Sequence, residues 1–144
     1  MRLYRLVLAL VLVGATTALA HQGVTNAGVM ARMENMSAAK KDIAILNDMA
    51  KSKTPFDQAK ADAAKERLLT ETKAVAGLFS EPHTDPKSEA LPKIWDEFDL
   101  FIAQADRAVD AMANVDTRTL DTLRESLKAA NAACVQCHKT YRLD

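Results

Sequence analysis

The stretch LDTLRESLKAANAACVQCHKTY, from Leu120 to Tyr141, decides the fold of this 144-residue chain. Its apolar residues recur every three or four positions without a break, at Leu120, Leu123, Leu127, Ala130, Cys134, Cys137 and Tyr141. That spacing places all of them on one face of an α-helix. The stretch therefore predicts a helix that packs its apolar face into a helical bundle, close to the C-terminus.

Three segments upstream show the same periodicity and are predicted to be helices. The first runs from about Ala27 to Lys51, with Asn26 as its N-cap. The second begins at Thr54-Pro55, because a capping residue followed by proline is typical of a helix start. The third opens at Pro92 and is expected to bury Ile94, Trp95, Phe98, Phe101, Ile102, Ala105, Val109 and Met112.

The connections between these segments are short or rich in turn residues. The longest, from Ser80 to Leu91, contains Pro82 and Pro86, which prevent a helix from continuing through it. Gly and Pro are sparse elsewhere, and aromatic residues make up only 5% of the chain, which does not favour strands. The sequence therefore predicts an all-α protein, an antiparallel up-down-up-down four-helix bundle.

The last predicted helix carries Cys134-Val135-Gln136-Cys137-His138, a complete C-x-x-C-H motif. Two thiols at this spacing can each form a thioether bond with a vinyl group of haem, and the adjoining imidazole becomes an axial ligand of the iron. A thioredoxin-like redox pair would need a βαβ context, and a structural zinc site would need two more Cys or His ligands. The motif therefore predicts one covalently attached haem c near the C-terminus, held by Cys134 and Cys137 with His138 as a metal ligand.

The N-terminal residues 1–20 have the pattern of a secretory signal peptide. Basic Arg2 and Arg5 precede an apolar run that is too short to span a bilayer, and Ala18-Leu19-Ala20 follows as a cleavage site. Cleavage would leave residues 21–144 as a single cytochrome domain, exported and without membrane insertion. Export agrees with the motif. In an oxidising compartment two free cysteines three positions apart would risk forming a strained disulfide, whereas thioether bonds to haem would consume both thiols.

The charge of the chain is balanced. The full sequence has 19 basic and 19 acidic residues, and removing Arg2 and Arg5 leaves a net charge of about −2. This balance argues against binding to nucleic acid or to an anionic membrane surface.

Four motifs together resemble the class II c-type cytochromes, the cytochrome c′ and cytochrome c-556 family. They are Arg32-x-x-x-Met36, Thr54-Pro55-Phe56, Leu91-Pro92-Lys93-Ile94-Trp95 and the segment from Cys134 to Arg142. The resemblance covers the whole mature chain and implies a periplasmic mono-haem protein of a Gram-negative bacterium. Members of this family are often homodimers.

The resemblance directs attention to Met36, which lies four positions after Arg32. Low-spin members bind a methionine sulfur at this position and transport electrons, whereas high-spin members place a shielding residue there and bind small gases such as nitric oxide. A thioether is a soft ligand suited to iron, and His/Met ligation raises the reduction potential. Methionine also fills gaps in cores, so Met36 is either a ligand or a packing residue. Met33 is the reserve candidate.

Two arginines are further candidates for haem contacts. Arg32 resembles the family's arginine that meets a haem propionate, and a guanidinium suits a carboxylate; a solvated surface charge is the alternative. Arg142 lies one helical turn after His138 and could tune the proximal imidazole or act as a cation at the helix C-terminus.

These observations predict a periplasmic electron carrier with His138 and Met36 as axial ligands and a redox protein as its partner. The alternative is a high-spin, gas-binding protein of the cytochrome c′ type. Enzymatic activity is not expected, because acid–base chemistry on a bound peroxide would need a distal His or a similar group.

Overall fold

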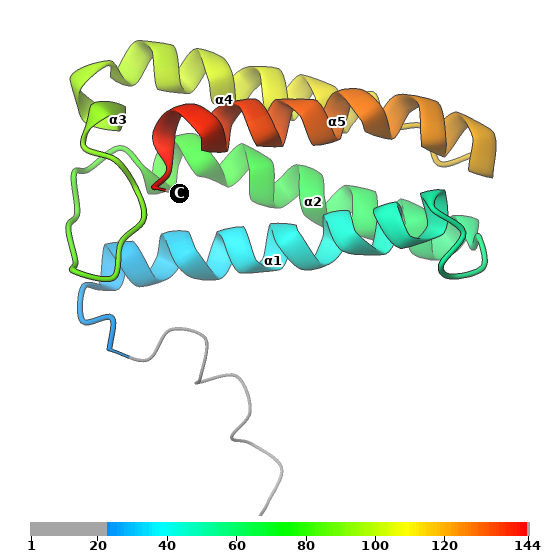
Figure 1. Ribbon diagram of the computed structural model, residues 1–144, viewed down its shortest axis with the longest axis horizontal. Coiled ribbons are helices and arrows are strands. Elements are labelled where there is room, and N and C mark those ends of the chain that lie inside the picture. Colours follow the sequence, from blue (N-terminus) through cyan, green and yellow to red (C-terminus); the bar gives the residue numbers. More distant parts are fainter. Residues whose placement is uncertain (1–22, 144) are drawn as a thin grey trace, which may run out of the picture.

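The computed structural model describes residues 23–143, and within them the chain forms five helices. These are α1 (Ala27–Ala50), α2 (Gln58–Leu78), the single turn α3 (Lys93–Asp96), α4 (Phe98–Ala113) and α5 (Leu120–Tyr141). Figure 1 shows the four long helices lying side by side, with successive helices antiparallel. The predicted all-α four-helix bundle is thus confirmed. The predicted signal peptide, residues 1–20, lies outside the described residues.

The first and last helices have the predicted bounds within one residue. The Asn26 side chain caps α1, because its Oδ1 accepts hydrogen bonds from the amides of Gly28 at 2.9 Å and Val29 at 3.1 Å. At the start of α5, Thr119 and Thr122 form a reciprocal capping box. Both helices therefore begin where a polar side chain replaces the missing intrahelical partners.

The predicted start of the second helix at Thr54-Pro55 is wrong. Thr54 and Pro55 lie exposed in the connection, and α2 begins at Gln58 behind Asp57. The Asp57 carboxylate accepts a hydrogen bond from the Lys60 amide at 3.1 Å. Phe56, just before this cap, packs against a buried cluster that includes Ala61, which fixes the entry of the chain into the helix.

The predicted third helix is divided in two by Glu97, whose φ of −132° and ψ of 49° are not helical. The interruption reorients the chain, and Ile94 before it and Phe101 after it both stay buried in one cluster. The predicted burial holds for Ile94, Phe101, Ala105 and Met112, whereas Trp95, Phe98, Ile102 and Val109 are half-buried. Neither Pro nor Gly marks the break, so the sequence carries no signal for it.

The core consists of two clusters that occupy different parts of the bundle. The leucine cluster contains Leu46, Met49, Ala61, Ala64, Leu68, Met112, Val115, Leu123, Leu127 and Ala130. The aromatic cluster contains Val75, Phe79, Ile94, Phe101, Ala105 and Tyr141. Within residues 23–143, no helix is both long and apolar enough to cross a membrane.

Candidate functional site

The C-x-x-C-H turn lies where the two core clusters meet. Cys134 packs against the leucine cluster and Cys137 against the aromatic cluster, whereas Val135 between them is 64% exposed. Both thiols are free and half-buried. Because the two sulfurs share the inner face of α5, one planar macrocycle beside this face can bond to both of them.

Burial changes the acidity of the two thiols. It raises the pKa of the Cys134 thiol, and burial together with the Cys134 charge raises the pKa of Cys137 to about 11. Both sulfurs are therefore protonated at neutral pH in this fold.

The His138 side chain is half-buried on the last turns of α5. Burial lowers the pKa of the imidazole, the nearby Arg142 charge lowers it further, and Glu89 opposes the shift. The ring is therefore neutral at pH 7, which is the form that can give a nitrogen lone pair to a metal.

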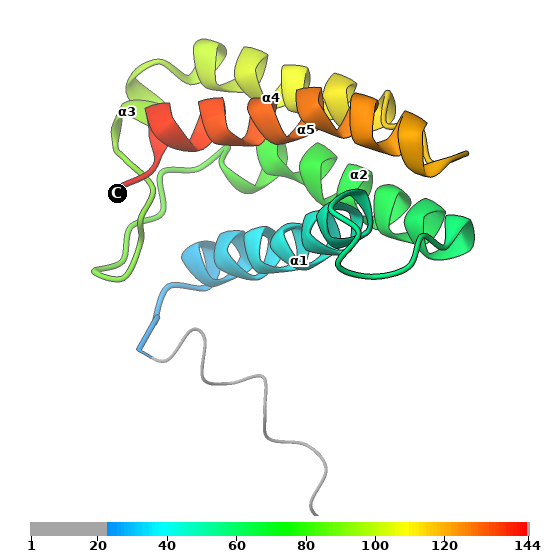
Figure 2. The same cartoon turned by 45° about the vertical axis from the view of Figure 1, so that its right-hand side comes forward.

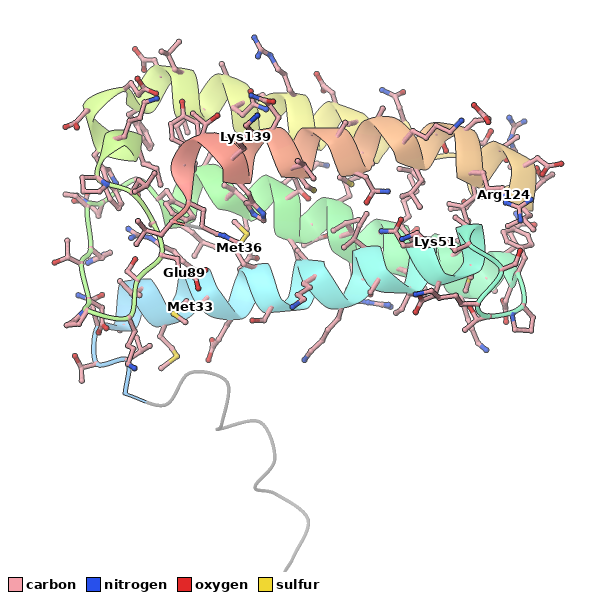
Figure 3. The ribbon with its side chains drawn as sticks, viewed as in Figure 1. Met33, Met36, Lys51, Glu89, Arg124 and Lys139 are labelled. Atoms are coloured by element: carbon pink, nitrogen blue, oxygen red, sulfur yellow. The ribbon has the colours of Figure 1, made fainter. Side chains whose placement is uncertain are left out.

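Met36 extends from α1 toward α5, as Figure 3 shows, whereas Met33 lies away from α5. Met36 is half-buried and packs against the aromatic cluster, the same cluster that Cys137 contacts. Met49 is 3% exposed inside the leucine cluster. The arrangement thus favours Met36 over Met33 and Met49 as the residue that faces the C-x-x-C-H turn.

Arg32 is 3% exposed and binds the connection between α2 and α3. Its Nε donates to the Leu78 carbonyl at 2.8 Å and its Nη1 to the His83 carbonyl at 2.9 Å, while Nη2 donates to the Glu81 carbonyl. The guanidinium also lies 4.6 Å from the centre of the Phe79 ring and 5.0 Å from that of Trp95. The predicted alternative of a solvated surface charge is therefore wrong, and the propionate contact stays a prediction.

The α2–α3 loop, residues 79–92, is also attached to the start of α1. The Asp85 carboxylate accepts hydrogen bonds from the amides of Thr25 at 2.8 Å and Asn26 at 3.2 Å. A hydrogen bond from the Lys87 amide, and then these two bonds, lower the pKa of Asp85. In addition, His83 lies so close to Gly28 that a Cβ there would come 2.1 Å from the ring. The absence of a side chain at Gly28 therefore allows the loop to lie on α1.

At its other side the loop pairs with the C-terminal tail. Ala90 and Arg142 form an antiparallel bridge, in which the Leu91 amide donates to the Tyr141 carbonyl at 3.0 Å and the Leu143 amide to the Glu89 carbonyl at 2.8 Å. Figure 2 shows the loop between the end of α5 and the start of α1. The loop thus joins the helix that carries Met36 to the helix that carries the C-x-x-C-H turn.

Sequence reasoning missed Glu89 and the loop contacts of Arg32. Glu89 forms an ion pair with Arg142, with 3.6 Å between Oε2 and Nε. The partners of Arg32 are main-chain carbonyls, which any residue provides, so no residue type in the loop could have revealed them. The ion pair had only a weak signal, because Glu89 is one of three acidic residues in the predicted loop and nothing in the sequence distinguishes it.

The donor set fits a haem c. Two thiols on one helix face, an imidazole one residue later and a thioether on the facing helix are the ligand types that c-type haem uses. The aromatic cluster beside Cys137 and Met36 is apolar, as the macrocycle requires. Outside these residues the described chain holds no group of three or more His, Cys, Asp or Glu side chains that could bind a metal ion.

Comparisons with known proteins agree with this arrangement. The family model described as Cytochrome C′ matches residues 27–142. Cytochrome c-556 from Rhodopseudomonas palustris is 31% identical over 134 residues, covering 83% of this chain and 89% of that protein. Cytochrome c-555 from Bradyrhizobium diazoefficiens is 29% identical over 149 residues, covering 96% of this chain and 95% of that protein.

Solved structures show the same fold. Cytochrome c′ from Rhodobacter sphaeroides superposes with a TM-score of 0.76 at 26% identity, covering 81% of this chain and 95% of that one. A leucine-to-isoleucine variant of cytochrome c′ from Alcaligenes xylosoxidans, in its nitric oxide complex, superposes with a TM-score of 0.73 at 25% identity. That match covers 81% of this chain and 94% of the variant.

Proposed function

Because the chain belongs to the cytochrome c′ family and is a c-type cytochrome with one covalent haem c, we propose that it is an electron carrier. In this proposal Cys134 and Cys137 hold the haem, and His138 and Met36 are its axial ligands. The observation that carries the proposal is that Met36 faces α5 and packs against the same aromatic cluster as Cys137.

The bound haem supplies an iron that accepts and gives up one electron. The residues of this chain determine how readily it does so. The neutral His138 imidazole and the Met36 thioether would favour the reduced state, because His/Met ligation raises the reduction potential. The apolar cluster around Cys137 keeps water away from the site.

A second candidate function is gas binding with Met36 as a shielding residue. The observation that favours it is the structural neighbour from Alcaligenes xylosoxidans, which was solved as a nitric oxide complex. In that case Met36 would pack beside the haem without a bond to iron, and Arg142 would stand near the proximal face. Neither function includes enzymatic turnover, since acid–base chemistry would need a polar group where Met36 lies.

The proposal includes export to the periplasm and removal of residues 1–20. It is supported by the signal-like N-terminal sequence and by the family, whose members are periplasmic. The partners would be redox proteins that approach the C-x-x-C-H turn, where Val135 and Gln136 are exposed, and a second copy of the chain in a homodimer.

Optical spectra of the purified holoprotein, recorded in both oxidation states and with carbon monoxide, test the axial ligation. We expect the ferric protein to have a low-spin spectrum with the far-red sulfur–iron band. The spectrum of the ferrous protein should change little when carbon monoxide is added. Met36→Leu should lose the band, and Met33→Leu should keep it. A five-coordinate high-spin spectrum of the unchanged protein, shifted by carbon monoxide, would overturn the electron-carrier proposal in favour of gas binding.

A further inference from the structure

Two opposite charges lie beside His138 on the side of the bundle closed by the α2–α3 loop. Arg142 caps the C-terminus of α5, four residues after His138, and its amide donates to the His138 carbonyl at 2.9 Å. Glu89 belongs to the loop, and its carboxylate lies 3.6 Å from the Arg142 guanidinium. Figure 3 shows Glu89 on the loop between the end of α5 and α1.

The backbone fixes the position of both residues. Hydrogen bonds from Leu91 to Tyr141 and from Leu143 to Glu89 form the antiparallel bridge between the loop and the tail. The Glu89 carbonyl itself accepts the second of these bonds, at 2.8 Å. The Glu89 main chain is therefore fixed beside the tail that follows the C-x-x-C-H turn, independently of the pairing of its side chain.

A second ion pair lies close to Tyr141, and its two charges compensate each other. Lys93 of α3 forms an ion pair with Glu97 at 3.2 Å, and its ammonium lies 5.8 Å from the centre of the Tyr141 ring. The charges of both Glu89 and Arg142 act on the His138 imidazole, with opposite signs.

We propose that Glu89 is a positioning residue of the haem site that compensates the charge of Arg142 and thereby lowers the reduction potential of the haem. A positive charge near the iron stabilises the ferrous form, which carries one positive charge less than the ferric form. The Glu89 carboxylate offsets that effect directly, and by pairing it also holds the guanidinium toward the loop. The inference stands whether or not Met36 binds the iron.

The ion pair of Glu89 and Arg142 contributes little to the stability of the fold, so its effect on the reduction potential can be measured without unfolding the protein. The side chains of Arg142 and Glu89 are 52% and 66% exposed. Exposed ion pairs contribute little to the free energy of folding. Glu89→Gln should therefore fold like the unchanged protein and differ from it in the potential.

Spectroelectrochemical titration of the holoprotein tests the proposal, with Glu89→Gln, Arg142→Gln and the double variant compared at low ionic strength. We expect Glu89→Gln to shift the ferric–ferrous equilibrium about two- to fivefold toward the ferrous form, or about 20–40 mV, since tenfold corresponds to 59 mV. Arg142→Gln should shift it in the opposite direction. The two shifts should not add in the double variant, because each residue changes the effect of the other.

Glu125→Gln is the matched control. Glu125 and Lys128 form an exposed ion pair at 2.9 Å on α5, before the C-x-x-C-H turn. Glu125→Gln should leave the reduction potential of the haem unchanged. In about 1 M salt the shift caused by Glu89→Gln should shrink, because the screening length falls to about 3 Å. A potential equal to that of the unchanged protein would overturn the inference. So would a shift that persists in high salt, which would indicate a rearranged loop.

Discussion

The helices α1 and α5 are held together directly at one end of the bundle and through a loop at the other. At the direct end, Asn47 and Asn131 exchange two amide hydrogen bonds, of 3.0 and 2.9 Å. There Arg124 also donates from Nε to the Ala50 carbonyl at 2.8 Å. Figure 3 shows Arg124 and Lys51 at this end and Met36 with Glu89 at the opposite one.

At the haem end the α2–α3 loop replaces these direct contacts. Arg32 of α1 binds three carbonyls of residues 78–83, and the other side of the loop pairs with the tail after α5. The loop lies around the end of the bundle, so the inner faces of the two helices remain available to Met36 and Cys137. The difference teaches that a helical bundle can keep two helices in register while leaving the space between them to a cofactor.

The largest expected effect is at the haem end and comes from removing both thioether positions. Cys134→Ser with Cys137→Ser should abolish covalent attachment, because no other cysteine exists in the chain. Mass spectrometry of the denatured protein would then show the bare polypeptide. Val135→Ala, an exposed change between the two cysteines, should retain the haem. A haem-containing mass for the double variant would contradict the assignment.

Removing the Arg32 guanidinium should open the loop. Arg32→Gln loses charged hydrogen bonds to three main-chain carbonyls and the contacts with two aromatic rings, so we expect the free energy of unfolding to fall by about 2–4 kcal/mol. Chemical denaturation measures the loss, and hydrogen exchange should show faster opening of residues 79–92. The control Arg118→Gln, an exposed arginine paired with Asp116, should leave that exchange unchanged. Unchanged protection of the loop in Arg32→Gln would show that the other contacts suffice.

A change at the direct end should affect stability and leave the haem unaffected. Asn47→Ala removes one partner of the amide pair and should lower the free energy of unfolding by about 1 kcal/mol. Asn131→Ala should cost about as much, and the double variant should cost less than the sum of both, because the two side chains bind each other. Optical spectra of these variants should match the unchanged protein. A shift in the spectrum would mean that the direct end also positions the haem ligands.

The smallest effect concerns the polar contact between α1 and α2, where Arg67 binds the buried Asp42 through two nitrogens. Burial, and then the Asp42 carboxylate, raise the pKa of the neighbouring Glu71. A raised pKa in the folded state means that folding favours the protonated form. The stability that Glu71 contributes is therefore complete at pH values below the ordinary pKa of glutamate. It is lost as the pH rises through the raised value.

Glu71→Gln replaces the carboxyl group with an amide that stays neutral at every pH, so the variant should be slightly more stable than the unchanged protein at neutral pH. Its free energy of unfolding, measured by denaturation across the acidic to neutral range, should decline less with rising pH than that of the unchanged protein. Glu66→Gln, an exposed change on the same helix, should keep the original pH dependence. Identical profiles for Glu71→Gln and the unchanged protein would contradict the raised pKa.

Local signals in the sequence were sufficient for several features. Apolar periodicity located α1 and α5 within one residue, because the side chains of a bundle helix must face one core. The C-x-x-C-H motif named the haem site, because the thioether chemistry depends on residues adjacent in sequence. The start of α2 was misplaced by three residues because the capping side chain is that of Asp57, which accepts a hydrogen bond from the Lys60 amide, and not that of Thr54.

The sequence by itself determined the fold class, the family and the cofactor, since each of these depends on residue spacing along one chain segment. The tertiary structure decided which methionine faces the C-x-x-C-H turn, what Arg32 binds and that Glu89 stands beside Arg142. The contacts of Arg32 and of Glu89 join residues about 50 positions apart. They involve main-chain carbonyls or exposed charges, which leave no pattern in the sequence. Their geometry exists only once the loop has folded onto both helices.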